Sequence, residues 1–305
     1  MTIHTQWSIL TISILLISTI FLVGCNRDPY KSISVYPEHF KITTPFIIGT
    51  HGILINTNWG EDKRHHVLFI DNYSPSWIKK SVVQADNLLL KGSEFKFRTS
   101  TGSGKPLEGK VGICDSLAFE SVAFKKVPFY IIDSDTNDKT YDGVLGSELM
   151  SKGIWKIDFK NNLLTFTSNI DSLPESLGCE SILTTVESNR IMVNVGLSSG
   201  LTQHMFVDLG FNGDLLVSQD DSVYLSSKSK FVTDKVKLST PSDTKIISRL
   251  SALDTVKISN HWFATFVSTT KSTNDRLIGL QFLRRFSFII IDFKNKKLLV
   301  PKMLS

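Results

Sequence analysis

Apolar and polar residues alternate with a period of two along much of this chain. The segments 53–56, 95–99, 191–195 and 236–238 all follow this pattern. Successive side chains of a strand point to opposite faces, so a period of two indicates half-buried strands. Turn-forming residues such as Asn58-Trp59-Gly60 separate the segments. The pattern therefore predicts an all-β protein in which short strands are joined by hairpins.

Helical periodicity is confined to two short segments, 147–152 and 281–285. Each follows a tripeptide of two apolar residues and a glycine, at 144–146 and 277–279. We expect two brief helices at these places, and strands almost everywhere else.

Three short motifs occur twice in the same order: two apolar residues before Asp, two apolar residues before Gly, and Ile-Asp-Phe-Lys-Asn. The first copy comprises residues 69–71, 144–146 and 157–161, and the second comprises residues 206–208, 277–279 and 291–295. A fixed order of motifs indicates two copies of one folding unit. It also places one acidic residue, Asp71 or Asp208, at the same position of each copy.

The junction between the copies is marked by the breaker residues Pro174 and Gly178. We predict an N-terminal lobe over residues 41–173 and a C-terminal lobe over residues 174–305. Without its first 24 residues the chain of 305 keeps 281, which is the length of about two domains.

The chain begins with an apolar stretch, Ser8 to Gly24, that contains no Lys, Arg, Asp or Glu. Its end, Leu22-Val23-Gly24-Cys25, is typical of a lipoprotein signal in which Cys25 becomes the lipidated first residue. We therefore expect a signal peptide over 1–24 and a lipidated tether over 25–40. The alternative is an uncleaved anchor, because roughly 17–25 apolar residues can span a bilayer. Both interpretations place the rest of the chain in the cell envelope, attached to a membrane and outside the cytoplasm.

The net charge of +5 is small, and basic residues occur in separate pairs such as Lys79-Lys80 and Arg284-Arg285. Nucleic-acid binding requires clustered basic residues, so we expect no nucleic-acid partner.

Cysteine and histidine spacing gives no metal motif, and we predict neither a metal nor another cofactor. We expect the adjacent pair His65-His66 to lie on the solvated surface. With Cys25 assigned to the lipid, Cys114 and Cys179 either form a disulfide or remain two separate thiols.

The doubled motif order resembles the pepsin/retropepsin-like aspartic peptidases. Proteins of that family carry Asp-Thr/Ser-Gly in each of two lobes, and a later apolar-apolar-Gly that passes the Asp loop. This chain carries Asp71-Asn72-Tyr73 and Asp208-Leu209-Gly210 at those places. The resemblance covers the chain from about Ile53 to Val300. It implies an all-β fold of two pseudo-symmetric, β-barrel-like lobes with short helices. We expect a monomer, because an internally doubled chain has less need to dimerise.

The resemblance further implies that Asp71 and Asp208 face each other and form a catalytic pair. Two carboxylates ~3 Å apart share one proton, so one can take a proton from water while the other donates to a peptide carbonyl. The hairpin over 95–113, with Gly102 and Ser103 at its tip, would close over a peptide or protein substrate. Gly210 would let the backbone pass beneath the carboxylates.

Three residues depart from the family motif. Asn72 and Leu209 replace the hydroxyl residue that bonds to the opposite lobe; an Asn amide can form a substitute bond, whereas a Leu side chain cannot. Tyr73 replaces Gly, needs space that the family leaves empty, and is strained if the site requires a positive φ.

These departures leave the function open between classes. One is an aspartic endopeptidase that hydrolyses peptide bonds with a water activated between two carboxylates. The other is a catalytically inactive surface lipoprotein that binds a peptide or protein in the same cleft. A structural lipoprotein without a ligand is a third possibility.

Overall fold

The computed structural model describes residues 29–50, 52–59, 65–85, 90–100, 106–133, 140–221, 232–240, 243–270 and 275–302. The chain divides into two compact units, residues 1–32 and 33–305. The described residues of the first unit form one 3-10 helix, η1 (Pro29–Ser32). The predicted signal peptide and Cys25 lie outside the described residues. Within the described ranges, none of the helices has the length and apolar character needed to cross a bilayer.

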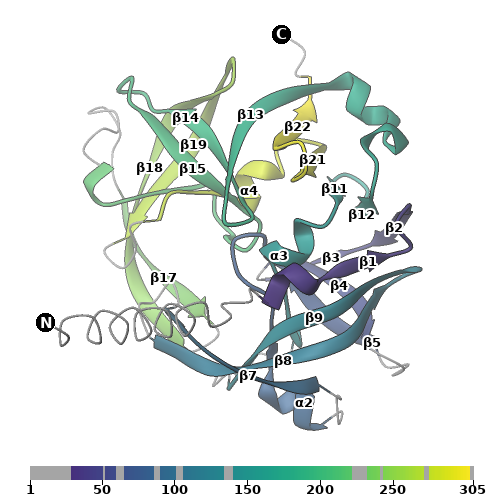
Figure 1. Cartoon of the computed structure of the whole chain (residues 1–305). Coiled ribbons are helices and arrows are strands. Elements are labelled where there is room, and N and C mark those ends of the chain that lie inside the picture. Colours follow the sequence, from purple (N-terminus) through teal and green to yellow (C-terminus); the bar gives the residue numbers. More distant parts are fainter. Residues whose placement is uncertain are drawn as a thin grey trace, which may run out of the picture. The chain divides into compact units, whose positions relative to one another are not determined.

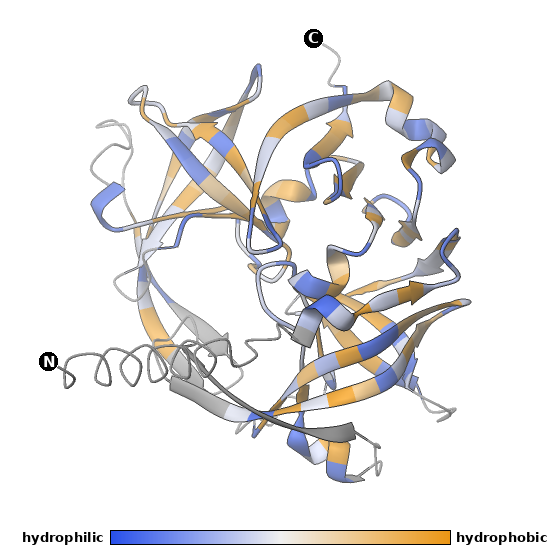
Figure 2. Cartoon of the chain, viewed as in Figure 1, coloured by the Kyte–Doolittle hydropathy of each residue, from blue (hydrophilic) through white to orange (hydrophobic). Residues whose placement is uncertain are grey.

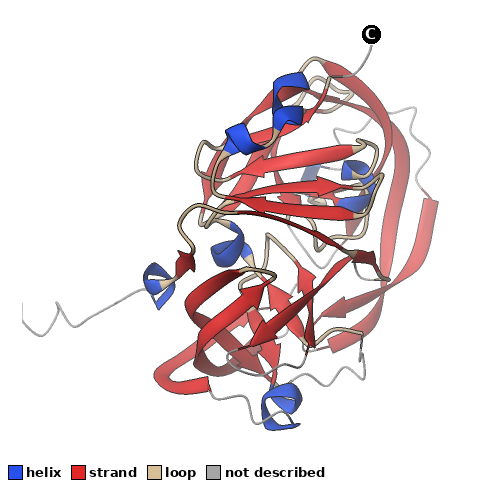
Figure 3. Cartoon of the chain, turned by 90° about the vertical axis from the view of Figure 1, so that its right-hand side faces the viewer, coloured by secondary structure: helices blue, strands red, loops and turns tan. Residues whose placement is uncertain are grey.

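The second unit consists mainly of strands (Figures 1 and 3), which confirms the all-β prediction. We call residues 33–173 its first half and residues 174–302 its second half. The strands of the first half are β1 (Ser34–Tyr36), β2 (Lys41–Pro45), β3 (Ile47–Ile48), β4 (Ile53–Trp59), β5 (His65–Ile70), β6 (Trp77–Lys79), β7 (Leu90–Ser100), β8 (Pro106–Phe119), β9 (Val122–Ile132), β10 (Gly143–Leu145), β11 (Ile154–Asp158) and β12 (Leu163–Thr167). The strands of the second half are β13 (Cys179–Glu187), β14 (Arg190–Gly196), β15 (Thr202–Asp208), β16 (Leu215–Val217), β17 (Val232–Thr240), β18 (Asp243–Ile258), β19 (His261–Thr270), β20 (Leu277–Gly279), β21 (Phe288–Asp292) and β22 (Lys297–Pro301).

Helices are short. The two that were predicted are present as α3 (Ser147–Met150) and α4 (Leu280–Leu283), and α2 (Lys80–Ala85) was not predicted. The 3-10 helices η2 (Ile170–Ser172) and η3 (Pro174–Gly178) occupy the segment in which the junction was predicted.

The strands form two sheets. A nine-stranded sheet has the order β1-β9-β6-β10-β5-β4-β8-β7, with β3 paired to β4. A thirteen-stranded sheet has the order β17-β18-β19-β16-β20-β15-β14-β13-β22-β21-β11-β12-β2. The second sheet therefore includes three strands of the first half, and β11 pairs with β21 across the two halves. Apolar and polar residues alternate along the strands (Figure 2), as the period of two requires.

The strands that end at the two acidic residues are paired in the same way in each half. β5 runs parallel to β10 with Ile70 opposite Leu145, and β15 runs parallel to β20 with Val207 opposite Ile278. β6 and β16 lie antiparallel on the other side of β10 and β20. Each acidic residue is thus placed beside an apolar-apolar-Gly strand.

The glycine of each apolar-apolar-Gly motif lies against the backbone of the acidic loop. A Cβ atom on Gly146 would come within 2.4 Å of the backbone of Pro75 and Ser76. On Gly279 it would come within 2.3 Å of the carbonyl oxygen of Gly213. Only glycine permits this approach, so the motif specifies how strand and loop pack.

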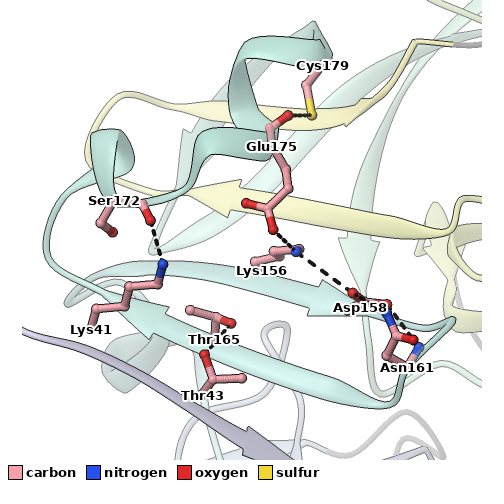
Figure 4. A network of polar contacts seen from close by, with 9 residues as sticks. All are labelled: Lys41, Thr43, Lys156, Asp158, Asn161, Thr165, Ser172, Glu175 and Cys179. Carbon is pink, nitrogen blue, oxygen red and sulfur yellow. Dashed lines mark hydrogen bonds and ion pairs between the residues drawn. The ribbon is translucent and has the colours of Figure 1, made fainter.

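A polar network attaches the segment between the halves to the shared sheet (Figure 4). The Nζ atom of Lys156 on β11 lies 2.7 Å from Glu175 Oε1 of η3 and 3.8 Å from Asp158 Oδ2. Lys41 of β2 donates to the carbonyl of Ser172 in η2 at 2.6 Å. Because Lys156 is only 8% exposed, its charge needs these carboxylates.

Cysteine and histidine residues are placed as follows. Cys114 is buried, Cys179 is partly exposed, and both are free thiols, so the alternative of separate thiols is correct. The surface prediction holds for His65 but is wrong for His66, which is 2% exposed. The alternation of β5 turns His66 inward, where its Nδ1 lies 3.5 Å from Asp142 Oδ2.

We predict that Gly146→Ala lowers the free energy of unfolding by about 3 kcal/mol, because the methyl group would overlap backbone rather than a mobile side chain. Gly178→Ala is the matched control, since a Cβ there has no atom within 4 Å; we expect it to change stability by less than about 1 kcal/mol. Urea denaturation of both variants measures this. Equal stabilities would contradict the packing role of Gly146.

Candidate active site

Asp71 and Asp208 stand at equivalent strand ends, and backbone amides of the following turn hold each carboxylate. Asp71 directly follows β5, and Asp208 is the last residue of β15. The amides of Tyr73 and Ser74 donate to Asp71 Oδ1 at 2.9 and 3.0 Å. The amides of Gly210 and Phe211 donate to Asp208 Oδ1 at 2.8 and 3.1 Å. In each loop one carboxylate oxygen is fixed, and these bonds leave Oδ2 available for other partners.

The two carboxyl groups lie together. A Cβ on Gly210 would come within 2.4 Å of Asp71 Cγ, so the first carboxyl rests directly on the backbone of the second loop. The Asp208 carboxyl is within hydrogen-bonding reach of Asp71. Asp208 is 5% exposed, and Asp71 keeps partial access to solvent.

The surroundings raise the pKa of both acids, and different neighbouring charges act on each of them. Burial raises the pKa of Asp71, while the Tyr73 and Ser74 amides, the Arg190 charge and the bond with Asp208 lower it in part. Burial raises the pKa of Asp208 well above its usual range, and the charges of Asp71 and Asp275 raise it further. Burial thus opposes ionisation of both acids, which favours a state in which the pair shares one proton.

Asn72 joins the two loops with both ends of its amide. Its Nδ2 donates to the carbonyl of Val207 at 2.7 Å, and its Oδ1 accepts from the amide of Leu209 at 2.8 Å. The expected substitute bond is therefore present. Leu209 is fully buried and has no polar side-chain atom to return a bond to the first half.

Tyr73 is accommodated without the predicted strain. Its φ lies outside the left-handed region, so the condition under which we expected strain is not met. Its hydroxyl donates to Asp275 Oδ1 at 3.0 Å, and its ring lies 5.1 Å from Phe206 and 4.3 Å from the Arg190 guanidinium carbon. Sequence reasoning missed Arg190, which no motif marks, and the role of Asp275.

The predicted hairpin over 95–113 is present as β7 and β8, paired antiparallel as far as Ser100 opposite Pro106. Gly102 and Ser103 lie outside the described residues. β17 and β18 form the corresponding hairpin of the second half. Among the described residues, no group of three or more His, Cys, Asp or Glu side chains could hold a metal ion.

Glu148 is a further buried acid next to the site that sequence reasoning did not identify. It is 3% exposed at the start of α3 and accepts from the Ser76 amide at 2.6 Å. The Ser76 hydroxyl in turn accepts from the Gly146 amide at 2.9 Å. Burial raises the pKa of Glu148 to about 7. In the second half Gln281 occupies the same helix position, is exposed, and donates to Asn212.

No family model matches this sequence, and no curated protein matches it. Solved structures do match its fold. The aspartic proteinase from Irpex lacteus is 16% identical, with a TM-score of 0.62 over 87% of this chain and 98% of that one. Basic 7S globulin from soybean is 9% identical, with a TM-score of 0.54 over 86% of this chain and 95% of that one. This chain has the fold of the pepsin-like aspartic proteinases, as the resemblance implied.

We predict that Glu148→Gln flattens the pH dependence of stability. Glu148 is protonated in the folded state up to about pH 7 but ionises near the ordinary glutamate pKa of 4.5 when unfolded. Wild-type stability therefore falls between these two values, by about 3 kcal/mol, and the loss is complete above the higher one. Glutamine keeps an acceptor for the Ser76 amide and carries no charge. The variant should match wild type at pH 4 and exceed it at pH 8.

The control is Glu38→Gln, which neutralises an exposed carboxylate. Its unfolding curves should follow wild type at both pH values. Parallel pH dependences for wild type and Glu148→Gln would show that Glu148 is not the titrating group.

Proposed function

We propose that this protein is an aspartic endopeptidase in which Asp71 and Asp208 activate water to hydrolyse peptide bonds. One observation carries the proposal: the carboxyl groups of Asp71 and Asp208 lie together, and two amides of its own loop hold each of them. The fold agrees with it, since the Irpex lacteus protein is an aspartic proteinase.

We assign the roles from the neighbouring charges, because Arg190 lowers the pKa of Asp71 whereas Asp275 raises that of Asp208. Asp71, the ionised member, takes a proton from a water molecule placed between the carboxyls. Asp208, the protonated member, donates to the carbonyl oxygen of the peptide bond. Water oxygen adds to the carbonyl carbon, and the tetrahedral intermediate forms without a covalent bond to the protein. Its breakdown transfers a proton to the leaving nitrogen and separates the two products.

The buried apolar residues that precede the two acids in the chain support this chemistry. Ile70 and Val207 are fully buried beside the acidic residues, and Phe69 is 7% exposed. A low-dielectric setting makes two negative charges costly, which favours the singly protonated pair.

Leu209 favours a second candidate, a module that binds peptides or proteins without cleaving them. The hydroxyl that the family places at this position is missing, and a carboxylate displaced by about 1 Å can lose ~10²-fold in rate. Binding with no cleavage by the wild-type chain would support this candidate.

We also propose that a lipid on Cys25 tethers the protein to a membrane in the cell envelope and that the protein is a monomer. The apolar stretch that ends at Cys25 supports the tether. Mass spectrometry of the mature N-terminus and the membrane partitioning of Cys25→Ala test it. A Cys25→Ala chain that remains processed and membrane-bound to the wild-type extent would contradict lipidation.

We predict that Asp71→Asn and Asp208→Asn each lower cleavage of a mixed peptide library by about 10²–10⁴-fold. Wild-type activity should have a bell-shaped pH profile. The acid limb reports protonation of Asp71 and lies above the ordinary aspartate pKa of 3.8, because burial raises the pKa of this carboxyl. The basic limb reports loss of the last proton from Asp208.

The control is Asp171→Asn, which changes an exposed aspartate in η2 and should cleave like wild type. The full-length chain is assayed from pH 3 to 8, with products identified by mass spectrometry. Cleavage that survives either active-site substitution would rule out the dyad and point to a contaminating peptidase.

A further inference from the structure

The acidic loop of the first half has two side chains that reach the second half, whereas the acidic loop of the second half returns none at the equivalent position. Asn72 bonds to Val207 and Leu209. The other side chain is Tyr73, which follows Asn72 directly and donates its own amide to Asp71. The backbone amide of Tyr73 holds the Asp71 carboxylate, and the side chain of Tyr73 contacts the second half. Tyr73 therefore links Asp71 to the second half.

We propose that Tyr73 is a positioning residue of the Asp71–Asp208 pair: held between Arg190 and Asp275, it fixes the Asp71 loop on the second half and replaces the bond that Leu209 cannot make. The inference rests on the function proposed above. It deepens that function by giving Tyr73 a role and by adding Arg190 and Asp275, which no motif identifies.

Three separate contacts hold the Tyr73 side chain. The hydroxyl donates to Asp275, just before β20, at 3.0 Å. The Arg190 guanidinium carbon, at the start of β14, lies 4.3 Å from the ring centroid, within the range of a cation–π contact. The ring of Phe206 on β15 lies 5.1 Å away. The contacts come from three strand regions of the second half, so they fix both the orientation and the position of the Tyr73 ring.

A second anchor is needed for geometric reasons. The bonds of Asn72 attach the loop to the second half at one point. Asp71 rests on the backbone of Gly210, where a Cβ would overlap its carboxyl, so a small rotation would move the carboxylate out of contact. Tyr73 fixes a second point and thereby the orientation of Asp71.

The two charged partners also act differently on the two acids. The positive Arg190 favours the ionised form of Asp71, and the negative Asp275 favours the protonated form of Asp208. The Tyr73 hydroxyl stays protonated, since burial and the Asp275 charge raise its pKa. Both charges therefore favour a pair in which Asp71 is ionised and Asp208 is protonated.

Three substitutions in the full-length chain test the inference. Tyr73→Phe keeps the ring and removes only the bond to Asp275; we expect kcat to fall about 10-fold or more with KM unchanged, because the loss affects alignment and not substrate contact. Asp275→Asn removes a negative charge near Asp208 and should shift the basic limb to lower pH. Arg190→Gln removes the positive charge near Asp71 and should shift the acid limb to higher pH.

Non-additivity distinguishes positioning from general destabilisation. In the Tyr73→Phe background, Asp275→Ala should cause little further loss of kcat, because each change removes the hydrogen bond between the Tyr73 hydroxyl and residue 275. Tyr36→Phe is the control, because it removes a tyrosine hydroxyl from the edge strand β1, where Tyr36 is 69% exposed. It should leave kcat and both limbs as in wild type. A Tyr73→Phe enzyme with wild-type kcat would overturn the inference.

A direct titration separates failure of this inference from failure of the proposed function. If wild type cleaves no peptide, the carboxyl ¹³C signals of Asp71 and Asp208 can still be followed by NMR from pH 3 to 9. The signal of Asp208 should titrate at lower pH in Asp275→Asn, and that of Asp71 at higher pH in Arg190→Gln. Midpoints equal to those of wild type would reject the inference whether or not the chain is active.

Discussion

The contact between two carboxyl groups from distant parts of the chain is the interaction on which the rest of the site depends. Burying two charged carboxylates side by side is strongly unfavourable. The protein reduces this cost by sharing one proton and by giving each carboxylate two backbone amides. The amides are available only because each strand ends at its Asp and the chain then turns. The local turn therefore makes the long-range contact possible.

The same contact explains the glycines and the shared sheet. Gly210 lies so close to Asp71 that any side chain would separate the carboxyls. Because Gly146 and Gly279 have no side chain, the acidic loops can pack closely against the neighbouring strands. The pairing of β11 with β21 and the ion pairs of Lys156 bind the two halves into one sheet. With the halves connected in this way, side-chain bonds as short as those of Asn72 can join the loops.

Corresponding positions of the two halves carry different side chains with different contacts. Asn72 bonds in both directions where Leu209 offers only its backbone, and Glu148 is buried where Gln281 is exposed. The site is thus symmetric in its backbone and asymmetric in its side chains. This asymmetry can give each acid a fixed role, which two identical environments would not.

The sequence by itself determined the all-β class, the two short helices, the hairpins and the candidate pair Asp71 and Asp208. These features depend on local periodicity, turn residues and motif order, which can be read directly from the order of residues along the chain. Only the tertiary structure decided that Tyr73 is unstrained, that His66 and Glu148 are buried, and that Arg190 and Asp275 approach the pair. These facts depend on which side chains meet across more than a hundred residues. Burial and electrostatic coupling depend on that spatial proximity. The local pattern of apolar and polar residues carries no information about it.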